Sequence, residues 1–164
     1  MNEVYLLLGS NVGNRIENLK KAIGLIESEC GKIKSISSVY ETAAWGLKEQ
    51  NNFLNEALCI YTSLTAKVLL KILKNIEKET GRTKTVKWGP RVIDIDILFY
   101  GEEIIDTPEL KIPHPYLHER KFTLVPMNEI APHFLHPVLH LTVNELMKKC
   151  VDESEVTEYL AEMN

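Results

Sequence analysis

Apolar positions in the first 31 residues predict a buried strand followed by an amphipathic helix. The run Val4–Leu8 is continuously apolar and ends at Gly9, which is typical of a short strand buried on both faces. Apolar residues then recur at helical spacing through the range 16–30. Asn14 is placed to cap the start of this helix, and Gly31 lies where it should stop.

The stretch from 33 to 100 predicts three more strands and a second helix. Residues 33–42 and 53–62 both alternate in the manner of strands. A stripe of leucines and isoleucine in 65–80 predicts an amphipathic helix, with Gly81 expected as its C′ residue. The range 92–100 is rich in isoleucine and aromatic residues and predicts a further strand.

The order of these elements, β-α-β-β-α-β, is the split pattern of a ferredoxin-like α+β fold. All seven prolines lie between residues 90 and 137, and short helices are predicted near 122–130 and 142–149. We therefore expect a ferredoxin-like βαββαβ core with a proline-rich C-terminal extension bearing short helices. A length of 164 residues suits a single domain, residues 1–164.

Charge is distributed unevenly along the chain. The net charge of −4 argues against a protein that coats a nucleic-acid polymer. Residues 82–91, however, carry four cations and no acid, which leaves 15 cations against 23 acids elsewhere. A small anionic ligand is therefore compatible with the sequence. Three well-separated cysteines without a C-x-x-C pair, and no apolar stretch of ~20 residues, favour a cytoplasmic protein that does not enter membranes.

The sequence also predicts two long loops, residues 43–52 and 82–91, between elements that should end on the same side of the sheet. Long loops within a compact domain are more often functional than accidental. These two loops therefore mark the expected position of a binding site.

The strongest chemical signal is the pair Asp94 and Asp96, which directly follows the cationic loop. In a strand, residues i and i+2 share a face, so the two carboxylates should lie about 7 Å apart at Cα, with isoleucines 93, 95 and 97 on the opposite face. Oxygen ligands without neighbouring His or Cys suit Mg²⁺. The pair alone also fits the solvated face of an amphipathic strand. Carboxylates together with Arg and Lys indicate a phosphate site with a metal ion.

Other signals are weaker when taken singly. Gly9-Ser10-Asn11 follows the first strand and also fits a simple strand-to-helix turn. The segments 42–46 and 53–55 bring aromatic residues and an asparagine to one loop, which suits a flat heteroaromatic ligand or merely the rim of the core. His114 stands between two prolines, and His133, His136 and His140 have no metal-ligand spacing and are interpreted as structural or surface residues. Neither a Walker A loop nor a G-x-G-x-x-G motif occurs.

Taken together, these motifs resemble the 6-hydroxymethyl-7,8-dihydropterin pyrophosphokinase family of folate biosynthesis. The resemblance extends over nearly the whole chain. It is carried by Gly9-Ser10-Asn11, Phe53-Leu54-Asn55, Glu77 with Gly81-Arg82, the specific block from Trp88 to Asp96, Ile112-Pro113-His114, and Arg120-Lys121-Phe122.

The resemblance implies transfer of the terminal pyrophosphoryl group of ATP to the hydroxymethyl oxygen of the reduced pterin, with release of AMP. It implies that Asp94 and Asp96 bind two Mg²⁺ ions. Arg82 and Arg91 match arginines that engage the phosphates and support the transition state, so these four residues form the expected catalytic set.

The same resemblance implies the substrate contacts. The ATP-contacting positions are Glu77, Lys84, Lys87, Trp88, Ile97, His114 and Arg120. The pterin-contacting positions are Thr42, Ala43, Trp45, Phe53, Asn55 and Phe122, with the two phenylalanines stacking on the ring. The two long loops correspond to lids that close over both substrates.

Two other classes of function remain open at this point. One is a non-catalytic module that senses a nucleotide or a pterin, and the other is an RNA-binding module with the same order of elements. The acidic balance and the lack of the aromatic RNA-binding strand motif count against the second. The expected partners are ATP and 6-hydroxymethyl-7,8-dihydropterin, with no nucleic-acid polymer and no membrane, and a monomer is expected.

Overall fold

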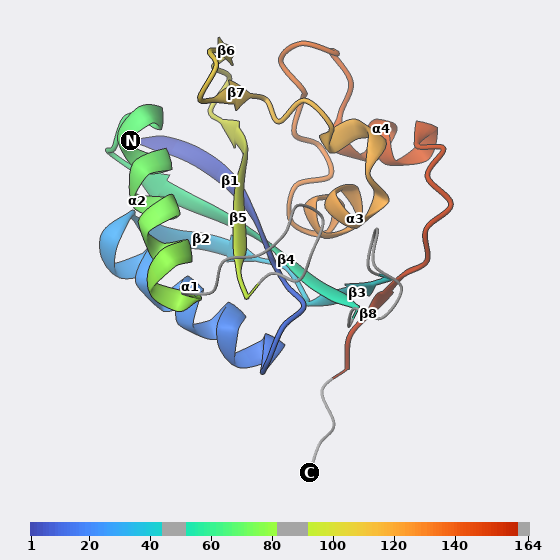
Figure 1. The fold of residues 1–164 in the computed structure, drawn as a ribbon. Coiled ribbons are helices and arrows are strands. Elements are labelled where there is room, and N and C mark those ends of the chain that lie inside the picture. Colours follow the sequence, from blue (N-terminus) through green and yellow to red (C-terminus); the bar gives the residue numbers. More distant parts are fainter. Residues whose placement is uncertain (44–51, 82–91, 161–164) are drawn as a thin grey trace.

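An antiparallel sheet with helices on both faces organises the chain in the computed structural model, which describes residues 1–43, 52–81 and 92–160 (Figure 1). Its strand order is β5-β1-β4-β3-β8, and β2 also pairs with β4. The six strands are β1 (Asn2–Ser10), β2 (Lys32–Ile36), β3 (Tyr40–Thr42), β4 (Phe53–Thr62), β5 (Asp94–Tyr100) and β8 (Val156–Glu158). The predicted α+β class is confirmed.

One face of the sheet is covered by α1 (Arg15–Glu29) and α2 (Ala66–Thr80) (Figure 1). The predicted N-cap is present, because the Asn14 side chain accepts a hydrogen bond from the amide of Glu17 at 3.1 Å. The other face is covered by α3 (Lys121–Ile130) and α4 (Val143–Lys149), which follow the short 3₁₀ turn η1 (Leu117–Glu119). The two predicted C-terminal helices are thus confirmed.

Strand β1 lies between these two hydrophobic layers, which explains its unbroken apolar sequence. Val4, Leu6 and Leu8 pack toward α1 and α2, whereas Tyr5 and Leu7 pack toward α3 and α4. Alternate residues of a strand point to opposite faces, so a strand covered on both sides needs apolar residues at every position.

The predicted single strand 33–42 is wrong, because it is divided into β2 and β3. At the break, Ser37 pairs with one residue of β4: its amide donates to the Ala57 carbonyl, and its hydroxyl accepts from the Ala57 amide, both at 2.9 Å. The next amide, of Ser38, donates to the Glu129 carboxylate on α3 at 3.0 Å. A side chain therefore replaces a backbone partner at this point, and the ladder is interrupted.

The predicted role of Gly81 also needs correction. This glycine is the C-cap of α2 and has an extended backbone with φ −138°, not the left-handed conformation of a typical C′ glycine. A Cβ at this position would lie 2.3 Å from Cβ of Val92. Glycine is required here for close packing against the start of the next strand.

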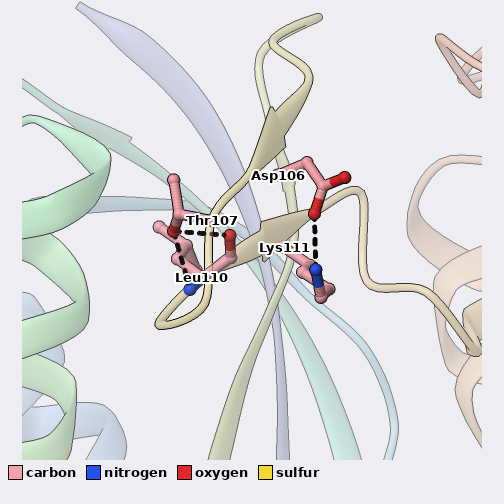
Figure 2. A network of polar contacts seen from close by, with 4 residues as sticks. All are labelled: Asp106, Thr107, Leu110 and Lys111. Atoms are coloured by element: carbon pink, nitrogen blue, oxygen red, sulfur yellow. Dashed lines mark hydrogen bonds and ion pairs between the residues drawn. The ribbon is translucent and has the colours of Figure 1, made fainter.

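A small hairpin between β5 and η1 was missed by the sequence patterns. It consists of β6 (Ile105–Asp106) and β7 (Lys111–Ile112) and is closed by polar contacts (Figure 2). The Thr107 hydroxyl donates to the Leu110 carbonyl and accepts from the Leu110 amide, each at 3.0 Å, and Lys111 forms an ion pair with Asp106. Two-residue strands carry too little alternation to be recognised.

The end of the described chain returns to the sheet as β8, an edge strand that pairs with β3. This short strand was likewise not predicted. None of the helices in the described part of the chain combines the length and the apolar character that crossing a bilayer requires.

Candidate active site

A cavity of about 540 Å³ opens on the face of the sheet that α3 covers. Its walls come from strands β1, β3, β4 and β5, from the segment around η1 and the start of α3, and from the chain leading to β8. The described residues that line it are Leu7, Gly9, Thr42, Ala43, Phe53, Asn55, Asp94, Asp96, Tyr116, Glu119, Arg120, Phe122, Val151 and Asp152.

Strand register arranges the floor of this cavity in rows. Gly9 of β1 is paired with Asn55 of β4 on one side and with Asp94 of β5 on the other. In the adjacent row, Leu7 is paired with Asp96. Directly paired residues of antiparallel strands point to the same face, so these side chains share the cavity. Gly9, with no side chain, leaves the space that the Asn55 amide occupies, because a Cβ at residue 9 would lie 2.8 Å from Nδ2 of Asn55.

The predicted shared face of the carboxylate pair is confirmed. Asp94 and Asp96 both line the cavity, whereas the isoleucines at 93, 95 and 97 are buried in the core on the opposite face. Burial raises the pKa of Asp96, and Arg120 and Lys74 partly offset this effect. A partly buried pair of carboxylates therefore needs a nearby cation to remain ionised at low cost.

The donor set of this pair suits a hard cation. Only carboxylate oxygens are offered by Asp94 and Asp96, and oxygen is the ligand that Mg²⁺ prefers. Within residues 1–43, 52–81 and 92–160, no cluster of three or more His, Cys, Asp or Glu side chains is placed to hold a metal ion. A cation held by the pair would thus take its other ligands from bound substrate and water, as Mg²⁺ commonly does.

The electrostatic balance of the cavity points the same way. Among its described lining residues, four are acids and Arg120 alone is basic. An anionic triphosphate would be repelled by this lining unless cations accompany it. The cationic segment 82–91, which lies outside the described residues, immediately precedes the carboxylate strand in the sequence.

Two polar side chains in the cavity have buried atoms without a hydrogen-bond partner among the described residues. Asn55 is 5% exposed, and its Nδ2 donates to the Leu8 carbonyl at 3.2 Å while its Oδ1 has no partner. Thr42 is 3% exposed, and its Oγ1 is also unpartnered. Because an unsatisfied buried polar atom is costly, two of them lining one cavity indicate a ligand that supplies the missing bonds.

Aromatic rings flank these polar atoms. Phe53 and Phe122 both line the cavity, as the stacking prediction requires. The Arg120 guanidinium lies 5.1 Å from the ring centroid of Tyr116 and 5.7 Å from that of Phe122. A planar cation between two rings is a favourable cation–π arrangement, and it holds Arg120 at the cavity wall.

Three predicted ATP contacts, Glu77, Ile97 and His114, are not among the described lining residues. Glu77 on α2 accepts a hydrogen bond from the Ile95 amide at 2.7 Å, and burial raises its pKa to about 7. Ile97 belongs to the core between β5 and the two N-terminal helices. Their predicted roles in binding ATP stay predictions.

His114 is anchored beside β5 by its backbone. Its amide donates to the Leu98 carbonyl at 3.0 Å, and its Nδ1 accepts from the Tyr116 amide at 3.2 Å. Burial, together with the charge of Arg120, lowers the pKa of His114 to about 4. The imidazole is therefore neutral at physiological pH.

The remaining predicted residues lie outside the described parts of the chain. They are Trp45 of the first long loop and Arg82, Lys84, Lys87, Trp88 and Arg91 of the second. The cavity therefore brings together eight of the predicted residues: Thr42, Ala43, Phe53, Asn55, Asp94, Asp96, Arg120 and Phe122.

The sequence patterns did not identify several lining residues. Tyr116 immediately precedes η1 and Glu119 is its last residue, and their position follows from the turn that leads the chain into α3. Val151 and Asp152 come from the C-terminal segment, 55 residues or more after the carboxylate pair. No local pattern marks them, because they reach the cavity only through tertiary folding.

Comparison with known proteins agrees with this site. The family model for 7,8-dihydro-6-hydroxymethylpterin-pyrophosphokinase matches residues 5–132. The chain belongs to this family. It is 50% identical over 145 residues to 2-amino-4-hydroxy-6-hydroxymethyldihydropteridine pyrophosphokinase of Aquifex aeolicus, a match that covers 88% of this chain and 90% of the relative. The enzyme of the same name from Bacillus subtilis is 44% identical over 131 residues, covering 79% and 78%.

Other relatives are longer proteins. The folic acid synthesis protein FOL1 of Dictyostelium discoideum is 45% identical over 145 residues, which span 88% of this chain but 22% of the relative. Among solved structures, the A437G form of Plasmodium falciparum HPPK-DHPS is similar with a TM-score of 0.75 and 21% identity. That match covers 90% of this chain and 45% of the other, and it supports the fold.

Proposed function

We propose that this protein transfers the terminal pyrophosphoryl group of ATP to the hydroxymethyl oxygen of 6-hydroxymethyl-7,8-dihydropterin and releases AMP. Membership of the pyrophosphokinase family supports this reaction. The structural observation that carries it is one cavity lined both by the carboxylate pair and by aromatic rings beside unpartnered amide and hydroxyl groups. The first set suits a metal-bound triphosphate, and the second suits a flat heteroaromatic acceptor.

The carboxylate pair would hold the metal. Asp94 and Asp96 offer the oxygen ligands that Mg²⁺ prefers, and two ions are proposed because the resemblance to the family implies them. When bound, Mg²⁺ would neutralise the phosphate charge and polarise the phosphorus that is attacked. Arg120, held between two rings at the wall, would add a cation beside the phosphates.

The acceptor would be recognised by shape and by hydrogen bonds. Phe53 and Phe122 would stack on the two faces of the pterin ring. The unpartnered Asn55 Oδ1 would accept a hydrogen bond from an N–H group on the edge of the ring, and the Thr42 hydroxyl would add a second bond. Fixing the ring in this way would aim its hydroxymethyl oxygen at the β-phosphorus. The entropic cost of orienting the two reactants would then be met by binding, before the chemical step.

In the proposed transfer, a bond forms between the acceptor oxygen and the β-phosphorus of ATP, and the bond from that phosphorus to the oxygen bridging to the α-phosphate breaks. AMP departs with the bridging oxygen, and the acceptor hydroxyl releases its proton to solvent. The segment 82–91, with Arg82 and Arg91, is proposed to support the charge that develops, as the resemblance implies.

We also infer that the core is ferredoxin-like and forms one domain, residues 1–164. In support, β4 lies between β1 and β2, and β1 lies between β4 and β5, so both β-α-β units are split by a strand. A cytoplasmic monomer is proposed as well. Of the three free cysteines, Cys30 and Cys59 are buried, and size-exclusion chromatography tests the oligomeric state.

Incubation with MgATP and 6-hydroxymethyl-7,8-dihydropterin tests the reaction. We expect AMP and pyrophosphorylated pterin in equal amounts, and no AMP when the pterin or the metal is omitted. Formation of ADP would instead indicate transfer of a single phosphoryl group. Binding of the pterin without any AMP would refute the enzyme and favour the sensing module.

A further inference from the structure

The C-terminal segment contacts two walls of the cavity, one at the start of α3 and the other at β3. This segment, Asp152–Tyr159, is called the brace below. Its first residue lines the cavity, and its later residues form β8 at the edge of the sheet. The brace lies beyond residue 132, where the match to the family model ends.

At one end of the brace, Asp152 binds the start of α3. Its Oδ2 accepts a hydrogen bond from the Lys121 amide at 3.0 Å, and its Oδ1 accepts from the amide and the hydroxyl of Ser154 at 2.9 and 2.6 Å. Burial tends to raise the pKa of this carboxyl, but these hydrogen bonds lower it below its usual value. Asp152 is therefore ionised, and both of its carboxylate oxygens accept hydrogen bonds.

This contact supplies a cap that α3 lacks. Arg120 is the N-cap residue of α3, and its side chain makes no capping hydrogen bond. Lys121 is the first helical residue, whose amide has no partner within a helix. A carboxylate from 31 residues further along the chain provides the acceptor and also complements the positive end of the helix dipole. The next residue is Phe122, which lines the cavity.

At its other end, the brace binds the opposite wall. Val156 of β8 is paired with Thr42 of β3, whose unpartnered hydroxyl lines the cavity. The Tyr159 amide donates to the Val39 carbonyl at 2.8 Å. The Arg15 guanidinium lies 5.5 Å from the centroid of the Tyr159 ring, which fixes the strand against α1.

We propose that Asp152 is a positioning residue for the pterin: as the cap of α3, it holds Phe122 at a set distance from the Thr42 wall. This inference rests on the proposed function and deepens it. Phe122 depends on this contact because it follows the capped residue directly. Arg120 depends on it less, because its amide bonds to the Leu117 carbonyl at 3.4 Å and its guanidinium contacts Tyr116. Loss of the cap should therefore weaken pterin binding more than nucleotide binding.

The test compares three variants of the full chain. Asp152→Ala removes both carboxylate oxygens, so the amides of Lys121 and Ser154 lose their acceptor. Ser154→Ala removes one bond to the carboxylate and leaves the bond to Lys121. Glu153→Gln makes the same change of charge at an exposed neighbouring residue. Pterin affinity is measured by fluorescence titration, KM and kcat by AMP release, and protection of the Lys121 amide by hydrogen exchange.

We expect Asp152→Ala to raise both the pterin Kd and the pterin KM by about fivefold, the size of a lost helix cap. The ATP KM and kcat should change by less than twofold, and both control variants should match the wild type. Equal losses for pterin and ATP, or a lower melting temperature with unchanged pterin affinity, would show that Asp152 only stabilises the fold and overturn the proposal. Lys121 protection should fall about fivefold in Asp152→Ala whether or not the wild type forms AMP. A wild type that forms no AMP would thus refute the proposed reaction, whereas unchanged protection of the Lys121 amide would refute the proposed cap.

Discussion

Replacement of Gly9 by alanine tests whether the floor of the cavity is built as the register indicates. Gly9 lies in the middle row between Asn55 and Asp94. A Cβ at residue 9 would lie 2.8 Å from Nδ2 of Asn55, whereas its next contact, with the Leu54 carbonyl, is an ordinary 3.8 Å. The added methyl group therefore meets one side chain, and that side chain carries the proposed contact with the pterin.

The structure sets the size of the effect. Ordinary contact begins at 3.4 Å, so Asn55 must retreat by about 0.6 Å. A shift of that size strains or breaks its 3.2 Å bond to the Leu8 carbonyl. Disrupting a buried hydrogen bond costs about 2 kcal/mol, which lowers the melting temperature of a domain of this size by about 4–8 °C. Displacing the amide from the pterin edge should weaken pterin binding at least about tenfold, or ~1.4 kcal/mol.

A double-mutant cycle isolates the contact. Melting temperature and pterin Kd are measured for Gly9→Ala, Asn55→Ala and the double variant. Once Asn55 is truncated, the methyl group has space, so Gly9→Ala should cost almost nothing in that background. Gly24→Ala is the matched control, because Gly24 is exposed on α1 and a Cβ there would meet nothing within 4 Å. It should leave pterin binding unchanged and stabilise the helix slightly.

An equal fall in melting temperature for Gly9→Ala with and without the Asn55 side chain would refute this explanation. That result would mean that the methyl group strains the backbone of β1 and not the amide. A Gly9→Ala variant with a melting temperature at least as high as that of the wild type and with equal pterin affinity would also refute it, because Asn55 would then have room to move.

Three further predictions concern the carboxylate of Asp96, the buried His136 and the C-terminal end of α2. Asp96→Ala should abolish AMP formation while leaving the melting temperature unchanged or slightly higher, because burial of this carboxylate is unfavourable without a cation; a large loss of stability would instead identify a structural carboxylate. Burial lowers the pKa of His136 to about 4, and its Nδ1 accepts two backbone amide bonds, so the unfolded chain takes up the proton first as the pH falls. The wild type should therefore lose up to about 3 kcal/mol of stability relative to His136→Asn between pH 7 and pH 4, measured by urea unfolding, and parallel pH profiles would contradict this. Gly81→Ala should cost about 1–3 kcal/mol through its overlap with Val92, and Val92→Ala should relieve that cost in a second double-mutant cycle.

Much of the candidate site could be predicted because its signals are local. The alternation that places Asp94 and Asp96 on one face follows from strand geometry alone. The three residues 53–55 likewise occupy a predicted strand, and the structure places both Phe53 and Asn55 in the cavity. Residues assigned only from the family resemblance are divided: Arg120 and Phe122 line the cavity. Glu77 and His114 are described, but they lie outside the cavity lining and hold backbone amides instead.

The helices, the main strands and the face on which the carboxylates lie could all be predicted from the sequence. Each of these depends on the spacing of apolar residues within one segment, and segments of this length have the same periodicity wherever they pack. The β2–β3 break shows the limit of this argument, because it is produced by the Ser37 hydroxyl on β4 and the Glu129 carboxylate on α3.

The contacts between residues distant in the sequence follow from the tertiary fold. The requirement for glycine at 9 and 81 comes from Asn55 and Val92, and no pattern around either glycine reveals these neighbours. In the sequence, Asp152 is one of several acids in an acidic segment, yet it caps a helix that begins 31 residues earlier. Such contacts depend on strand register and on how helices dock. Strand register and helix docking are set by the packing of the whole core, so they cannot be predicted from the local sequence.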